Sequence, residues 1–150
     1  MNLSKLVKTD RIRPDGSGYT VTAGTSDVNS DIIDTAGFEG IRIITGFGAI
    51  VSGAATSVKA QQNTANSGTG MADLAGTSIT VGDTDDNKVT IVEIYRPQER
   101  YIRQVTKRAS QNATIDFMIV EYYGAKKQPI TEGTNVISAE VSTSPAEGTA

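Results

Sequence analysis

Three runs rich in β-branched and aromatic residues lie between residues 88 and 124, and they constrain the fold more than any other stretch. They read KVTIVEIY at 88–95, RYIRQVTKR at 100–108 and ATIDFMIVEYY at 113–123, with the polar segments RPQE and ASQN between them. Residues of these types are typical of β-strands. Because each connection is about as long as a hairpin loop, we predict that the three strands form an antiparallel meander.

The third of these runs is apolar on both of its faces. In a regular strand, Ile115, Phe117 and Ile119 share one face, while Met118, Val120 and Tyr122 share the other. A strand with two apolar faces is usually central in its sheet, because both of its sides need a cover. We therefore predict that this run lies in the middle of a sheet.

The remaining runs are shorter and also follow β-strand patterns. Apolar stretches at 19–22, 41–47 and 56–62 are separated by Gly-containing turns, and no helical periodicity appears. This spacing predicts an all-β fold, an antiparallel β-sandwich or barrel-like domain with extended terminal arms. We place a flexible N-terminal arm at 1–18, the β domain at 19–124, and a C-terminal arm at 125–150 with one further strand at 135–141.

Composition excludes several classes of function. The 150-residue chain contains neither His nor Cys, so the commonest general base, transition-metal ligand and thiol nucleophile are missing. A net charge of −3 gives no general attraction to nucleic acid, and no apolar run approaches the ~20 residues of a membrane-spanning helix. Asp83, Asp85 and Asp86 lack the glycine and glutamate of a calcium loop and are typical of a solvated turn. We predict no enzymatic activity, no metal or other cofactor, and no nucleic-acid or membrane partner.

Basic and aromatic residues concentrate in two places, and these are our candidates for partner binding. One group lies near the N-terminus and the other near residue 100; together they are Lys5, Lys8, Arg11, Arg13, Arg96, Arg100, Tyr101 and Arg103. The N-terminal group fits either a solvated terminus or an arm that docks on an acidic surface. For the second group the alternatives are pairs between neighbouring strands, a protein interface, and single-stranded nucleic acid. The acidic charge of the whole chain disfavours nucleic acid.

Five short motifs give the chain a family resemblance. They are DTAGFEG at 34–40, SVKAQQ at 57–62, MADLAGT at 71–77, YRPQERYIR at 95–103 and SPAEGTA at 144–150. With them the chain resembles, from residue 31 onward, a family of small virion structural proteins of tailed bacteriophages. The resemblance implies a decoration or cement protein that binds the capsid exterior and stabilises the phage head, with the major capsid protein as its partner. It also implies a homo-oligomer, such as a trimer, located in the virion after assembly in the host cytoplasm.

Two other functions are compatible with an all-β chain of this composition. A carbohydrate- or receptor-binding β module of a phage particle would use the Gly-rich loop at 63–70. Aromatic residues make up only 5% of the chain and Trp is absent, which leaves few platforms on which a sugar can stack. A glycosidase would need two carboxyl groups about 5–9 Å apart in a cleft, and the sequence does not place such a pair.

Overall fold

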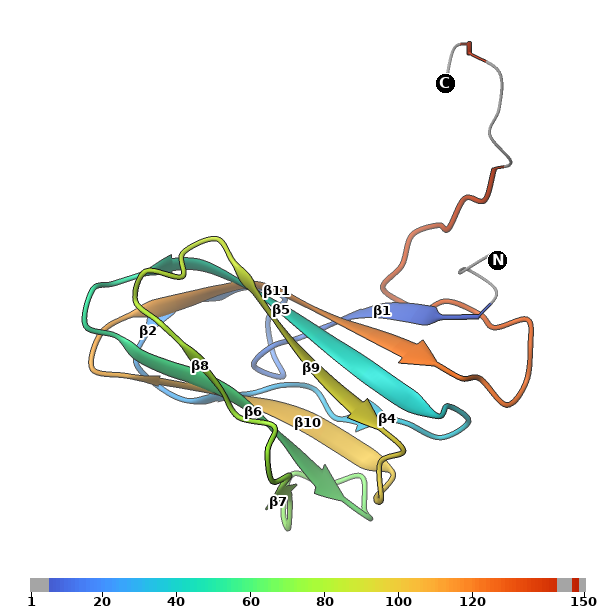
Figure 1. Ribbon diagram of the computed structural model, residues 1–150, viewed down its shortest axis with the longest axis horizontal. Coiled ribbons are helices and arrows are strands. Elements are labelled where there is room, and N and C mark those ends of the chain that lie inside the picture. Colours follow the sequence, from blue (N-terminus) through green and yellow to red (C-terminus); the bar gives the residue numbers. More distant parts are fainter. Residues whose placement is uncertain (1–5, 143–146, 149–150) are drawn as a thin grey trace.

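The computed structural model describes residues 6–142 and 147–148, which form two β-sheets that face each other (Figure 1). Its eleven strands are β1 (Lys8–Ile12), β2 (Val21–Gly24), β3 (Val28–Asn29), β4 (Ile33–Asp34), β5 (Gly40–Ile50), β6 (Ala55–Asn63), β7 (Ala72–Asp73), β8 (Ile79–Val81), β9 (Val89–Tyr95), β10 (Tyr101–Ala109) and β11 (Ala113–Tyr123). The described part of the chain holds no helix, and hence none that could cross a membrane. The predicted antiparallel β-sandwich is therefore confirmed.

The two sheets have different strand orders. The first sheet runs β1-β11-β5-β9, and β2 also pairs with β11. In the second sheet β10 pairs with β3, β4 and β6, and β6 also pairs with β7 and β8. Every one of these pairings is antiparallel. The central position predicted for the run at 113–123 is confirmed, because β11 lies between β1 and β5.

The meander predicted for the three main runs is wrong, although each run is a strand. The strand β9 pairs with β5, β10 pairs with β6, and β11 pairs with β5 and β1. The two connections therefore cross from one sheet to the other instead of joining neighbours. Arg96 and Ser110, with φ of 50° and 67°, redirect the chain at these crossings. Loop length alone did not distinguish such a crossing from a hairpin.

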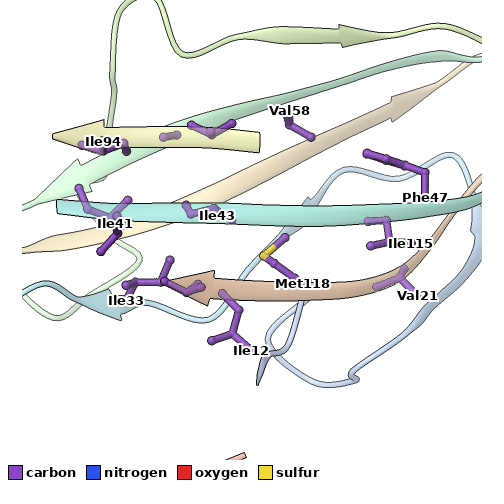
Figure 2. Close-up of a cluster of buried hydrophobic side chains, with 14 of the residues drawn as sticks. Ile12, Val21, Ile33, Ile41, Ile43, Phe47, Val58, Ile94, Ile115 and Met118 are labelled. Atoms are coloured by element: carbon purple, nitrogen blue, oxygen red, sulfur yellow. The ribbon is translucent and has the colours of Figure 1, made fainter. Parts of the chain in front are cut away.

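The core fills the space between the sheets with aliphatic side chains (Figure 2). Ile41 and Ile43 of β5 and Met118 and Val120 of β11 come from the first sheet, and Ile102 from the second; all five are fully buried. Alternate residues along each strand supply these contacts, as the period of two requires. Burial of this aliphatic surface is the main term that stabilises the fold.

A bulge in β11 changes which of its residues face the core. The pairing of β11 with β5 shifts register on both sides of Ile115. As a result Ile115 is buried together with Met118 and Val120, whereas Phe117 and Ile119 are only half-buried on the other face. The predicted grouping of Ile115 with Phe117 and Ile119 is wrong, because a β-bulge inserts one residue and reverses the alternation.

The N-terminal segment is not an arm over its whole predicted length. Residues 8–12 form β1, an edge strand paired with β11 from Lys8 opposite Tyr122 to Ile12 opposite Met118. Ile12 is buried in the core, which explains why this segment is held on the sheet. The predicted flexible arm at 1–18 is therefore wrong for β1, and residues 1–5 lie outside the described residues.

The predicted strand at 135–141 is also wrong, because residues 125–142 contain no strand. Instead, residues 132–136 run beside β1 and bond to its edge. Gly133 N donates to Thr9 O over 2.8 Å, and Thr9 N donates to Glu132 Oε2 over 2.5 Å. Asn135 Nδ2 donates to Arg11 O over 2.9 Å. One backbone amide and two side chains thus occupy edge positions that a further strand would have used, and beyond them the chain leaves the sandwich (Figure 1).

Candidate functional site

The outer face of the first sheet is the surface most suited to binding. Its register places Ile119, Ile44 and Ile91 side by side across β11, β5 and β9. Phe117 and Val89 lie in the neighbouring row, on either side of Gly46. We call these five apolar side chains, Ile44, Val89, Ile91, Phe117 and Ile119, the apolar face. Antiparallel sheets normally carry polar residues on a solvent-facing side, so this row pattern is unusual for an uncovered sheet.

The apolar face is substantially open to solvent. Val89 is 52% and Ile91 44% exposed, and the other three members are half-buried. Phe117 packs directly over Gly46, where a Cβ atom would overlap its ring. The glycine therefore lets the ring lie against the sheet. Exposed aliphatic and aromatic groups are typical of the centre of a protein interface.

A polar row borders the apolar face on the same side of the sheet. Across β1, β11, β5 and β9 it contains Thr9, Glu121, Arg42 and Glu93. Arg42 Nη1 bonds to Glu121 Oε2 over 2.8 Å, which pairs the two charges between neighbouring strands. Charged residues in this position resemble the polar rim that surrounds the apolar centre of an interface.

The polar row lines one side of a cavity of about 510 Å³, which we call the acidic cavity. Its lining residues are Val7, Thr9, Arg42, Glu93, Glu121, Tyr123 and Glu132. Tyr123 donates its hydroxyl to Glu93 Oε1 over 2.7 Å. Burial and this hydrogen bond raise the pKa of Tyr123, so its hydroxyl keeps its proton even in alkaline solution. The cavity can therefore bind polar groups through carboxylate oxygens, one guanidinium and one phenol.

The candidate residues near position 100 are engaged within the molecule. Arg100 makes two hydrogen bonds to Asp34, each of 2.7 Å, and lies over the ring of Tyr101. These bonds from Arg100 lower the pKa of Asp34. Arg103 Nε donates to Gln61 Oε1 over 2.7 Å, and Arg96 pairs with Glu39.

These contacts favour the pairing alternative for the second group. Tyr101 and Arg103 lie on β10 of the second sheet, and Arg96 and Arg100 lie on the connection from β9 to β10 at one end of the sandwich. All four are away from the apolar face. Their role in partner binding stays a prediction.

The N-terminal candidates lie on β1 and the turn after it. Lys8 Nζ sits 4.6 Å from the centre of the Tyr122 ring, and Arg11 lies over Tyr19. Arg13 forms an ion pair of 2.9 Å with Asp31. The remaining candidate of this group, Lys5, lies outside the described residues. The described members of this group are therefore in contact with the sandwich. Arg11 lies beside Ile119 and extends its row on the outer face of the first sheet.

The aspartates at 83–86 act in turns, as their spacing predicted. Asp83 accepts a hydrogen bond from Gly53 N, Asp85 from Gly82 N, and Asp86 from Ile50 N, over 2.6–2.8 Å. Each carboxylate thus satisfies a backbone donor of a neighbouring turn or strand. In the described part of the chain no three acidic side chains are grouped closely enough to hold a metal ion.

Sequence reasoning missed the apolar face. Its members come from three strands far apart in the chain, and only their register brings them together. One local signal was present, because the run VTIVEIY carries aliphatic residues at odd as well as even positions. Such a strand has apolar groups on both faces, although β9 lies at the edge of its sheet.

No protein-family model matches this sequence, and no curated protein matches it. Among solved structures, the chain is similar to chitosan-binding module 1 derived from a chitosanase/glucanase of Paenibacillus sp. IK-5. The TM-score is 0.39 and the sequence identity 14%, over 83% of this chain and 99% of that one. Neither value is high enough to transfer a ligand from that module to this chain.

Proposed function

We propose that the protein is a non-catalytic decoration or cement protein that binds the exterior of a tailed-phage capsid through the apolar face. The observation that carries this proposal is the contiguous apolar surface that the described chain leaves open, with Val89 and Ile91 about half exposed. Exposed apolar patches of this kind mark interaction surfaces in soluble proteins. The apolar face is mostly aliphatic, which favours a protein partner over a sugar, because sugars bind through open aromatic platforms and hydrogen bonds.

The phage head is proposed as the binding site because of the sequence motifs. Those at 34–40, 57–62, 71–77, 95–103 and 144–150 give the chain its resemblance to small virion proteins. The partner is then the major capsid protein, and the site of action is the assembled virion. A capsid presents many identical copies at fixed spacing, so a modest contact at each copy becomes strong when several are engaged together. A protein that binds the assembled lattice, and not its dissociated subunits, stabilises the lattice by mass action.

The experiment is to add the protein back to particles from which it has been stripped. Decorated particles are expected to release DNA at a higher temperature than stripped particles, because binding to the lattice lowers the free energy of the intact head. DNA release is followed with an intercalating dye during heating, and bound protein is quantified in parallel. Equal release temperatures at full occupancy, or binding to isolated capsid subunits as tight as to particles, would contradict the proposal.

The acidic cavity favours a second candidate function, the binding of a carbohydrate. A volume of about 510 Å³ falls in the range of small-ligand sites. Carboxylates outnumber cations among its lining residues, so a sugar with amino groups would be bound better than an acidic one. Binding of an amino-sugar oligomer that Glu121→Gln abolishes, together with no binding to particles, would establish this function in place of the first.

A further inference from the structure

The C-terminal segment presents aliphatic residues that the sandwich does not cover. Ile137 is fully exposed and Val141 is 50% exposed. In an extended chain Ile137, Ala139 and Val141 lie on one face, because side chains alternate with a period of two. An extended segment with one aliphatic face is suited to lie beside an existing β-strand.

The two edges of the first sheet differ in how they are covered. The β1 edge carries residues 132–136, bonded at Thr9 and Arg11. At the β9 edge, the described residues supply no strand that pairs with its outer side. Uncovered edge strands of this kind readily accept another strand.

The pairing of β9 shows which of its backbone groups point outward. Phe47 N donates to Lys88 O and Arg96 N donates to Glu39 O, so the even-numbered residues of β9 bond to β5. The N–H and C=O groups of Ile91, Glu93 and Tyr95 therefore point away from the sheet. Ile91 and Tyr95 also expose 44% and 56% of their side chains. This edge offers both hydrogen bonds and apolar contacts to an incoming strand.

We propose that residues 137–141 of one copy add as an antiparallel strand to β9 of a second copy. In the register that best matches side chains, Ile137 lies beside Tyr95 and Val141 beside Ile91. The small Ala139 then lies beside Glu93, where it leaves room for the longer side chain. Pairs between aromatic and β-branched residues on neighbouring strands are favourable.

The added strand must come from another molecule. Asn135 is held at β1 by its bond to Arg11 O and by the hydroxyl of Tyr19, which donates to Asn135 Oδ1 over 2.7 Å. Two residues further on, Ile137 can lie at most about 7 Å away. The β9 edge is three strand spacings from β1, or about 14 Å, so Ile137 cannot reach Tyr95 of its own chain.

Such a contact joins two different surfaces of identical chains. Each copy then gives its segment to the next, and the assembly either closes into a ring or continues as a chain. The added strand would widen the first sheet and extend the apolar face sideways, because Val141 lies beside Ile91. The contact between copies does not require that the capsid is the partner.

Engineered cysteines test the register directly, because the natural chain contains none. One preparation carries Ala139→Cys and a second, with a different tag, carries Glu93→Cys. Residues directly opposite in neighbouring strands lie within the Cα distance that a disulfide needs. We expect a disulfide between the two tagged chains on mild oxidation. The control partner carries Lys107→Cys, an exposed position on β10 of the second sheet. Linkage to Lys107→Cys as efficient as to Glu93→Cys would overturn the proposal.

A second measurement distinguishes this contact from nonspecific hydrophobic association. The full chain with Ile137→Asp and Val141→Asp is expected to self-associate about 100-fold more weakly, since burial of each of the two aliphatic side chains contributes about tenfold. The matched control, Ser138→Asp with Ser142→Asp, adds the same charge at alternate positions and should retain association. Sedimentation velocity over a concentration series measures both. Equal weakening in the two variants, or a natural chain that stays monomeric throughout, would overturn the proposal.

Discussion

Replacement of Arg108 with methionine is expected to destabilise the protein by about 3–5 kcal/mol. Arg108 lies on β10 and is only 6% exposed. Its Nε donates to Ser26 O over 2.8 Å, and its Nη1 donates to Thr22 O and Ala113 O, each over 2.9 Å. The guanidinium thus joins three backbone segments at one end of the sandwich. Methionine fills a similar volume but leaves these carbonyl groups without their donor.

Burial lowers the pKa of Arg108, in keeping with its low exposure. A matched control is Arg103→Met, on the same strand but on the outer side, where the guanidinium makes one bond to Gln61. We expect that change to cost about 1 kcal/mol. Urea unfolding of the two variants and the natural chain gives the comparison. Equal losses at both positions would show that the buried bonds of Arg108 do not hold these segments together.

The second large effect is expected on binding. Val89→Asp with Ile91→Asp should weaken binding to stripped particles by about 100-fold or more, because two aliphatic contacts are lost and two charges face an apolar partner. Both side chains lie on the solvent side of an edge strand, so the free energy of unfolding should change little. Co-sedimentation with particles measures binding, and circular dichroism checks the fold.

The control for this prediction places the same charges on the second sheet. The control variant carries Thr80→Asp and Ala109→Asp, both at exposed positions on β8 and β10. It should bind particles as tightly as the natural chain does. Loss of binding in both double variants would mean that added negative charge alone prevents the contact. Retained binding with aspartate at Val89 and Ile91 would exclude the apolar face as the docking surface.

Strand identity was predictable in this chain, whereas strand partners were not. Alternation and β-branched residues located β9, β10 and β11, since those signals depend on neighbours in sequence. Pairing depends on residues far away in the sequence. The strands β9 and β11 both pair with β5, which lies between them in the sheet and begins 49 residues before β9. The segment RPQE has the length of a hairpin loop, yet it carries the chain across to the other sheet.

The edges and irregularities of the first sheet were missed for a related reason. The basic residues of β1 fitted a solvated terminus or a docking arm, but pairing with β11 and the buried Ile12 hold that strand on the sheet. The bulge at Ile115 reverses the alternation that assigned Phe117 and Ile119 to the same side as Ile115. The apolar face depends on this reversal, whereas charge and composition predicted a binding site at Arg100 and Tyr101.

The most direct test of the proposed function is hydroxyl-radical footprinting of the protein on and off stripped phage particles. Phe117 on the first sheet and Tyr101 on the second are both half-buried aromatic residues with outward-facing side chains, and so form a matched pair. We expect particles to slow the oxidation of Phe117 several-fold and to leave that of Tyr101 unchanged. Equal protection of the two residues, or protection of Tyr101 alone, would contradict binding through the apolar face.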